Sequence, residues 1–93
     1  MKVELLSNGM ILFDNGEEIV QVFPASVKFI RVFPSEPDPK TKAKRDNWTV
    51  SVGGDMWIEF YVHDREEGDN LRLVINEILD TFTANGANGM HYG

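Results

Sequence analysis

The residues best suited to chemistry follow one another directly after residue 62. His63 precedes Asp64, Glu66 and Glu67, and an imidazole among carboxylates could bind a divalent metal ion or act as a general base. The same residues could instead form a solvated turn that caps a helix, because acidic side chains are stabilised at a helix N-terminus. We favour the cap, and we expect no metal site.

The rest of the sequence contains no recognisable catalytic motif. Cysteine is absent, His91 is the only other histidine, and there is no glycine-rich phosphate-binding loop. None of the four serines lies in the pattern of a nucleophile elbow. We therefore predict a protein that is not an enzyme, with no catalytic residues and no cofactor.

Basic charge is concentrated in residues 34–47, which also hold three of the four prolines. Such a segment cannot build a core, so we predict an exposed and flexible hairpin loop. One interpretation is a solubilising loop without a partner, which the composition favours. The other is a phosphate-binding loop with an aromatic ring as a stacking platform. Its candidate ligand-binding residues are Lys40, Lys42, Lys44, Arg45 and Trp48.

One strand presents an unusual pair of faces. Residues 56–62 alternate, with Met56, Ile58, Phe60 and Val62 on one side and Trp57, Glu59 and Tyr61 on the other. If the first side meets the core, two large aromatic rings remain on the second, and an exposed apolar patch usually marks an interface. We predict a partner-binding surface that joins this side to the acidic helix start: Trp57, Glu59, Tyr61, Asp64, Glu66 and Glu67.

Length and charge limit the classes of function. The chain has 93 residues, with 9 Lys and Arg against 15 Asp and Glu, a net charge of −6. This length allows one small domain, and we expect it to span residues 1–84, with 85–93 as a frayed tail. An acidic protein is repelled by phosphate backbones, so direct nucleic-acid binding is disfavoured. With no membrane-spanning run and no signal peptide, we expect a cytoplasmic protein.

The periodicity predicts an α+β fold: an antiparallel β-meander of five to six strands with one C-terminal amphipathic helix. Asn8–Gly9 and Asn15–Gly16 separate the first short apolar segments, as hairpin turns with both residues at positive φ would. A helical spacing of apolar residues begins near Arg65 or Asp69, with Gly68 inside the helix or in the turn before it. Asn85–Gly86 supplies the expected stop signal.

The elements from residue 27 onward carry a family resemblance. They are the strand Val27 to Val32, the turn Gly53–Gly54, the strand segment 57–60 and the acidic cap 64–67. In this pattern the chain resembles small phage and prophage proteins of unassigned function, and its element order is similar to a reduced pleckstrin-homology-type sheet with a closing helix. The resemblance carries no catalytic motif and implies a small accessory role, such as inhibition of a host factor.

If a single helix packs on one face of the sheet, the apolar side chains on the other face remain exposed to water. A helix of roughly 15–18 residues is about 25 Å long and covers one face of a sheet. We expect a homodimer to cover the other face, with strong sheet curvature as the monomeric alternative. The apolar residues assigned to that other face are Leu6, Ile11, Phe13, Val20, Val22, Phe29, Phe33, Trp57 and Tyr61.

These expectations lead to one function and two alternatives. We expect a small acidic binding protein that acts by protein–protein interaction, as a phage-encoded inhibitor or modulator of a host factor. The first alternative is a protein that sequesters a nucleotide-like ligand at a subunit interface. The second is a nucleic-acid mimic, in which carboxylates imitate phosphates. The mimic would use Asp64, Glu66, Glu67, Asp69, Glu77 and Asp80.

Overall fold

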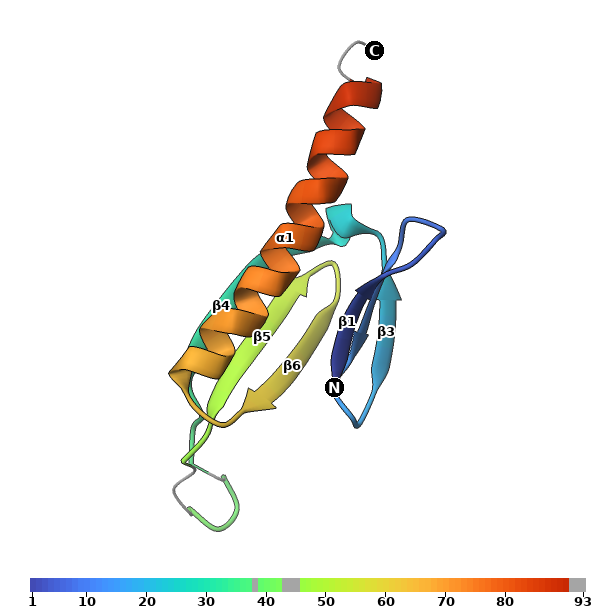
Figure 1. Cartoon of the computed structure of the whole chain (residues 1–93). Coiled ribbons are helices and arrows are strands. Elements are labelled where there is room, and N and C mark those ends of the chain that lie inside the picture. The colour runs from blue at the N-terminus through green and yellow to red at the C-terminus, as the bar shows by residue number, and fades with distance from the viewer. Residues whose placement is uncertain (38, 43–45, 91–93) are drawn as a thin grey trace.

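The computed structural model describes residues 1–37, 39–42 and 46–90. Over these residues the fold is α+β, with two antiparallel three-stranded sheets and a C-terminal helix (Figure 1). The N-terminal sheet contains β1 (Lys2–Leu5), β2 (Ile11–Asp14) and β3 (Ile19–Val22). The C-terminal sheet contains β4 (Val27–Pro34), β5 (Trp48–Gly54) and β6 (Trp57–Val62). The helix is α1 (Arg65–Met90).

The expected antiparallel strands and C-terminal helix are confirmed, but the strands form two meanders instead of one. The break lies at a short 3-10 helix, Pro24–Ser26, between β3 and β4. Pro24 is buried and has no N–H to continue a ladder. The Ser26 carbonyl instead accepts the backbone N–H of Asp55 at 3.0 Å, from the turn between β5 and β6. The linker is therefore held by the C-terminal sheet, and β3 remains an edge strand.

Both Asn–Gly pairs lie in hairpin turns, as predicted, but only their glycines have positive φ. Gly9 and Gly16 have φ values of 87° and 91°. The asparagines act through their side chains: Asn8 Oδ1 accepts the Met10 N–H at 3.0 Å, and Asn15 Oδ1 accepts the N–H groups of Glu17 and Glu18 at 2.8 Å. The turns therefore depend on side-chain hydrogen bonds that leave the asparagine backbone in an ordinary conformation.

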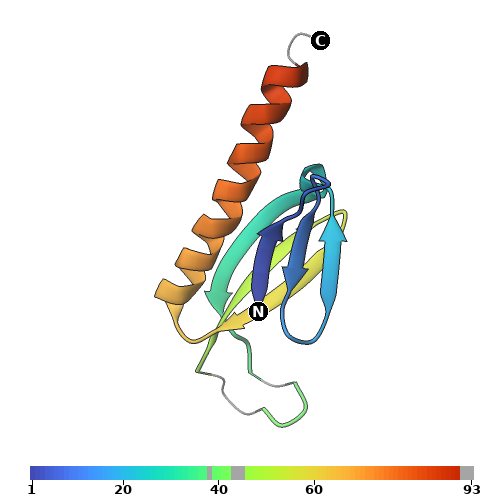
Figure 2. The ribbon, with the colours of Figure 1, turned by 45° about the vertical axis from the view of Figure 1, so that its right-hand side comes forward.

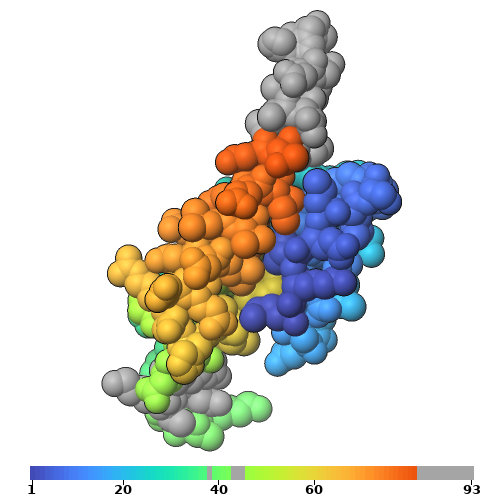
Figure 3. All heavy atoms as spheres, in the orientation of Figure 1, coloured from blue at the N-terminus to red at the C-terminus, as the bar shows by residue number. Residues whose placement is uncertain are grey.

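The N-terminal sheet and α1 lie side by side over the same face of the C-terminal sheet (Figures 1 and 2). Figure 3 shows how these two elements together cover most of that face. The Phe13 ring on β2 meets the Phe60 ring on β6, with centroids 6.2 Å apart. The fully or almost fully buried apolar side chains belong to all three parts: Ile11, Phe13, Val50, Val52, Ile58, Phe60, Val62 and Ile75. Ile11 and Phe13 therefore contribute to the core, and their assignment to the uncovered side is wrong.

The start of α1 follows the sequence prediction, and its end does not. Asp64 Oδ1 accepts the Glu67 backbone N–H at 2.9 Å, which confirms the acidic cap. The helix then continues through Asn85–Gly86 to Met90, so the predicted stop there is wrong. A glycine in a helix costs about 1 kcal/mol relative to alanine, which weakens an established helix without ending it. Residues 91–93 of the expected tail lie outside the described part of the chain.

Gly68 lies inside α1, at a point where the helix lies close against the sheet. It is buried, and a Cβ atom at this position would lie 2.9 Å from Val32 Cγ1, 3.4 Å from Val62 Cγ2 and 3.5 Å from Val50 Cγ2. These methyl groups belong to β-branched side chains, which have little rotamer freedom with which to move away. The contact thus explains why a poor helix former occupies the first turns of α1.

We predict that Gly68→Val destabilises the fold by about 2 kcal/mol, because overpacking against the three valines exceeds the gain in helix propensity. Urea unfolding followed by circular dichroism measures the change. The matched control is Asn70→Val, an exposed position on the same helix, which we expect to change stability by less than about 0.5 kcal/mol. Equal effects of the two substitutions would contradict the close approach at Gly68.

Candidate functional site

The candidate site is the face of the C-terminal sheet that points away from both α1 and the N-terminal sheet. We call it the outer face. The strand register places its residues in three rows across β4, β5 and β6. The first row is Phe29, Gly53 and Trp57; the second is Arg31, Ser51 and Glu59; the third is Phe33, Thr49 and Tyr61.

The flanking strands of the outer face carry large aromatic side chains that remain accessible. Trp57 is 56% exposed and Tyr61 is 46% exposed, and no element in the described part of the chain packs over them. The Phe29 and Trp57 rings meet edge to face, with centroids 5.3 Å apart. The Arg31 guanidinium lies over the Phe33 ring, 4.9 Å from its centroid. The predicted exposed aromatic strand face is therefore present.

The central strand of the outer face carries small side chains that form a floor. Gly53, Ser51 and Thr49 are all buried. The Thr49 and Ser35 hydroxyl groups are hydrogen-bonded at 2.8 Å, whereas Ser51 Oγ has no hydrogen-bond partner among the described residues. Because the side chains of β4 and β6 are long and those of β5 are short, a hollow of about 230 Å³ lies between them. It is lined by Arg31, Phe33, Glu36, Thr49, Glu59 and Tyr61.

Two opposite charges occupy the flanks of the middle row. Arg31 lies on β4 and Glu59 on β6, with Ser51 of β5 between them. Neighbouring strands are about 4.8 Å apart, so the two backbones are separated by about 10 Å. The arginine is placed over Phe33 instead of reaching across to the carboxylate. Each charge is thus available to a group that approaches the face from outside.

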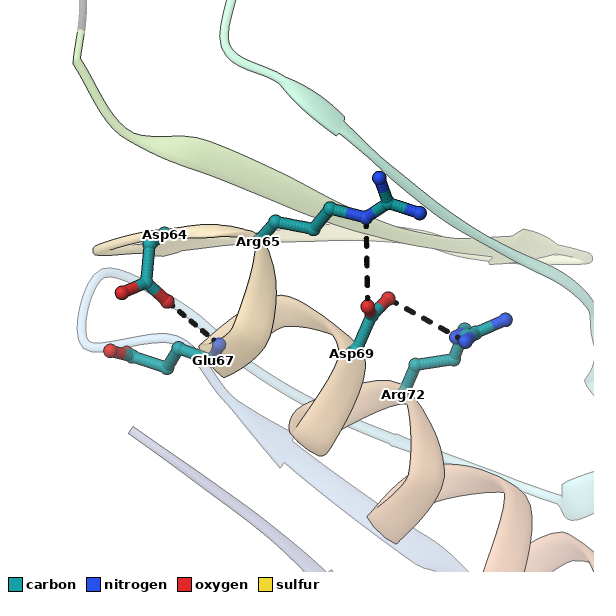
Figure 4. A network of polar contacts seen from close by, with 5 residues as sticks. All are labelled: Asp64, Arg65, Glu67, Asp69 and Arg72. Atoms are coloured by element: carbon teal, nitrogen blue, oxygen red, sulfur yellow. Dashed lines mark hydrogen bonds and ion pairs between the residues drawn. The ribbon is translucent and has the colours of Figure 1, made fainter.

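The structure separates the two halves of the predicted partner-binding surface. Trp57, Glu59 and Tyr61 lie together on the outer face, whereas Asp64, Glu66 and Glu67 lie where α1 begins, and α1 packs on the opposite face of the sheet. Asp64 is also used locally, because its carboxylate caps α1 (Figure 4). The sequence analysis already placed the helix on the face opposite Trp57 and Tyr61, as the structure does, but it still grouped the acidic start of that helix with the aromatic face.

The acidic side chains of α1 do not form an uninterrupted negative surface. Asp69 lies between two arginines, with its carboxylate oxygens 3.7 Å from Arg65 Nε and 3.5 Å from Arg72 Nη2 (Figure 4). Glu66, Glu67, Glu77 and Asp80 are exposed. His63 is exposed as well, and within residues 1–37, 39–42 and 46–90 no group of three or more histidines and carboxylates is placed to hold a metal ion.

The predicted ligand-binding residues of the basic loop are only partly described. Lys40 and Lys42 are exposed, and Lys44 and Arg45 lie outside the described residues. Trp48 lies on the inner side of the sheet, where it packs against the core. There it borders a second hollow of about 350 Å³ between β4 and α1, with Ile30, Val32, Arg65, Asp69 and Arg72. Among the described residues, the arginines that border this hollow with Trp48 are Arg65 and Arg72 of α1, which the sequence analysis did not connect with this ring.

Arg31 is the outer-face residue that the sequence analysis missed. The signal was present in the alternation of residues 29–33, where Phe29, Arg31 and Phe33 share one side of a strand. Because β4 pairs with β5 and β5 pairs with β6, that side of β4 lies on the same sheet face as Trp57 and Tyr61 of β6. The register across the sheet, which alternation within one strand does not contain, was therefore the missing information.

Comparison with known proteins gives no relative for this chain. No family model, no curated protein and no solved structure matches it. Within the described chain, no helix is long and apolar enough to cross a membrane. The site must therefore be interpreted from its own geometry.

We predict that Gly53→Ala disturbs the outer face, because an added Cβ would overlap the Phe29 ring that packs against Trp57. The expected cost is about 1–3 kcal/mol in urea unfolding, with a change in the near-ultraviolet circular dichroism of tryptophan. The control is Ser51→Ala on the same strand face. It removes a buried hydroxyl without a described partner and should be neutral or stabilising. A neutral Gly53→Ala variant would contradict the described ring packing.

Proposed function

We propose that the protein is a small non-enzymatic binding protein and that the outer face is its protein–protein contact surface. The observation that carries the proposal is the exposure of Trp57 and Tyr61 on a face that no described element covers. Aromatic residues and arginine are enriched in the cores of protein interfaces, and the outer face contains both. Between these aromatic residues lies a floor of buried small side chains, which leaves room for a partner's side chains.

The biological role that we propose is occupation of a partner, as a modulator or inhibitor. The element pattern described in the sequence analysis, which is similar to that of small phage and prophage proteins, makes a host factor the target that we propose, and the sequence expectation of a cytoplasmic protein gives the proposed site of action. The net charge of −6 supports a protein partner over a nucleic acid. Nucleic-acid mimicry has weaker support, because Asp64 caps α1 and Asp69 is paired with two arginines.

We predict that Trp57→Ala/Tyr61→Ala abolishes protein association while the circular dichroism spectrum is retained, because the contact loses its two most exposed aromatic rings. Two readouts are needed: co-purification of differently tagged copies of this chain, and capture of other proteins from a cell lysate. The double variant should lose every association that the wild-type chain makes.

The matched control is Ile19→Ala/Phe23→Ala, which also removes two large exposed apolar side chains but lies outside the C-terminal sheet. It should retain the wild-type associations. If the Trp57 and Tyr61 variant behaves like the wild-type chain in both assays, the outer face is not the contact surface.

A second candidate function rests on the hollow beside Trp48. An indole ring with two guanidinium groups nearby suits a nucleotide-like ligand, whose base can stack and whose phosphate would compete with the Asp69 carboxylate for the two arginines. This differs from the basic-loop site expected from the sequence, since Arg65 and Arg72 belong to α1. It keeps Trp48 as the stacking residue and supports sequestration as the alternative function.

We predict that, if sequestration is the function, a nucleotide or cyclic nucleotide will raise the melting temperature. Ligand at one hundred times its dissociation constant adds about 2.7 kcal/mol, which is roughly 10–20 °C for a domain of this size. Arg65→Ala/Arg72→Ala should remove the shift, and Lys2→Ala at an exposed position of β1 should retain it. The absence of a shift across the nucleotide panel would exclude this alternative.

A further inference from the structure

The outer face is complementary to a copy of itself in one orientation. Its middle row carries Arg31 on one flank and Glu59 on the other, with β5 between them. Consider two such faces packed against each other about a twofold axis that runs along β5. The axis exchanges the flanks, so β4 of one copy lies over β6 of the other. Arg31 of each copy then faces Glu59 of the other, and two opposite-charge pairs form.

The other face-to-face orientation is disfavoured by the same charges. A twofold axis across the strands places β4 over β4 and β6 over β6. Arg31 would then face a second arginine, and Glu59 a second carboxylate, in an interface that excludes water. Like charges in such a contact cost several kcal/mol in related systems, so charge selects the axis along β5.

The aromatic rows agree with this choice. With the axis along β5, Phe29 faces Trp57 of the other copy, and Phe33 faces Tyr61 of the other copy. Aromatic pairs on facing sheets add specific ring contacts to simple area burial. Sheets pack about 10 Å apart, a gap that long side chains span from both sides.

The twist of packed sheets does not disrupt the charged pairs. Aligned sheets cross at about 30°, so residues far from the crossing point are displaced the most. Arg31 and Glu59 flank Ser51, the central position of the nine-residue face, and each lies one strand from the axis. The middle row is therefore displaced the least, and both side chains are long and flexible enough to meet.

We infer that the occupant of the outer face is a second copy of this chain, in a twofold dimer with its axis along β5 and Arg31 paired with Glu59 of the other copy. This inference rests on the proposed function, because it concerns the same contact surface; in the dimer a second copy occupies that surface in place of a host factor. It also explains why the two charges lie apart within one chain: each has its counterion across the interface.

The test is a charge exchange followed by light scattering at micromolar concentration. The wild-type chain should have twice the 10.6 kDa mass of one chain. Arg31→Glu alone and Glu59→Arg alone should each weaken the dimer at least about tenfold. An equimolar mixture of the two variants should recover the dimer, because both interfacial pairs are opposite in charge again. The Arg31→Glu/Glu59→Arg double variant should recover it as well.

The charge exchange also distinguishes the effect of specific ion pairs across the interface from the effect of the net charge of the chain. Arg31→Glu makes the chain more acidic and Glu59→Arg makes it less acidic than the wild-type −6, so general repulsion would weaken only the first. Lys2→Glu and Glu4→Arg on β1 make the same two changes in charge at exposed positions outside this face. Both controls should remain dimeric. Recovery by mixing also shows that the single variants are folded.

Two results would overturn the inference. One is a wild-type mass of a single chain throughout the micromolar range. The other is a dimer that neither single reversal weakens, or that mixing does not restore. Neither decides the proposed function: a monomer that captures another protein through Trp57 and Tyr61 keeps the outer face as a contact surface with a different partner. If no protein association depends on Trp57 and Tyr61, the proposed function and the dimer inference are both wrong.

Discussion

The C-terminal sheet receives both of its packing partners on one face, and the rest of the structure follows from this constraint. Phe13 of the N-terminal sheet packs against Phe60, while Gly68 of α1 approaches the valines of all three strands. A chain of this length can build only a modest core. One short helix segment and one three-stranded sheet, placed side by side, are enough to cover a single face (Figure 2). No element of the described chain therefore packs on the opposite face.

That uncovered face differs from an ordinary solvated sheet face. A solvated face usually carries polar side chains on every strand. Here the central strand carries buried small residues, and the flanks carry four aromatic rings with one charge of each sign. Phe29 is half-buried against Trp57, and Phe33 lies against the Arg31 guanidinium, so the packing within one chain restricts these rings before any contact is made. Order in the free chain lowers the entropic cost of association. These properties are those that the proposed contact surface requires.

The sequence predicted what depends on local periodicity and failed where distant segments had to be placed. Alternation in residues 56–62 identified the exposed Trp57 and Tyr61, and Asp64 with Glu67 identified the cap. Ile11 and Phe13 were assigned to the wrong side because four-residue strands show which residues share a face but not which sheet they join. The helix was correctly expected opposite Trp57 and Tyr61, but the acidic residues at its start were grouped with that aromatic face, from which the structure separates them. The importance of Arg31 emerged only from the register of β4, β5 and β6.

The most direct measurement is a set of nuclear Overhauser contacts from the indole of Trp57, with isotope filtering to separate contacts within one chain from contacts between chains. Within one chain, the indole should contact the Phe29 ring, which lies 5.3 Å away by centroids, and should show no contact to methyl groups of α1 or the N-terminal sheet. The Phe13 ring should contact Phe60 in the same spectra. Contacts within one chain from Trp57 to α1 or to β1–β3 would show that the chain covers this face itself, and would contradict the account.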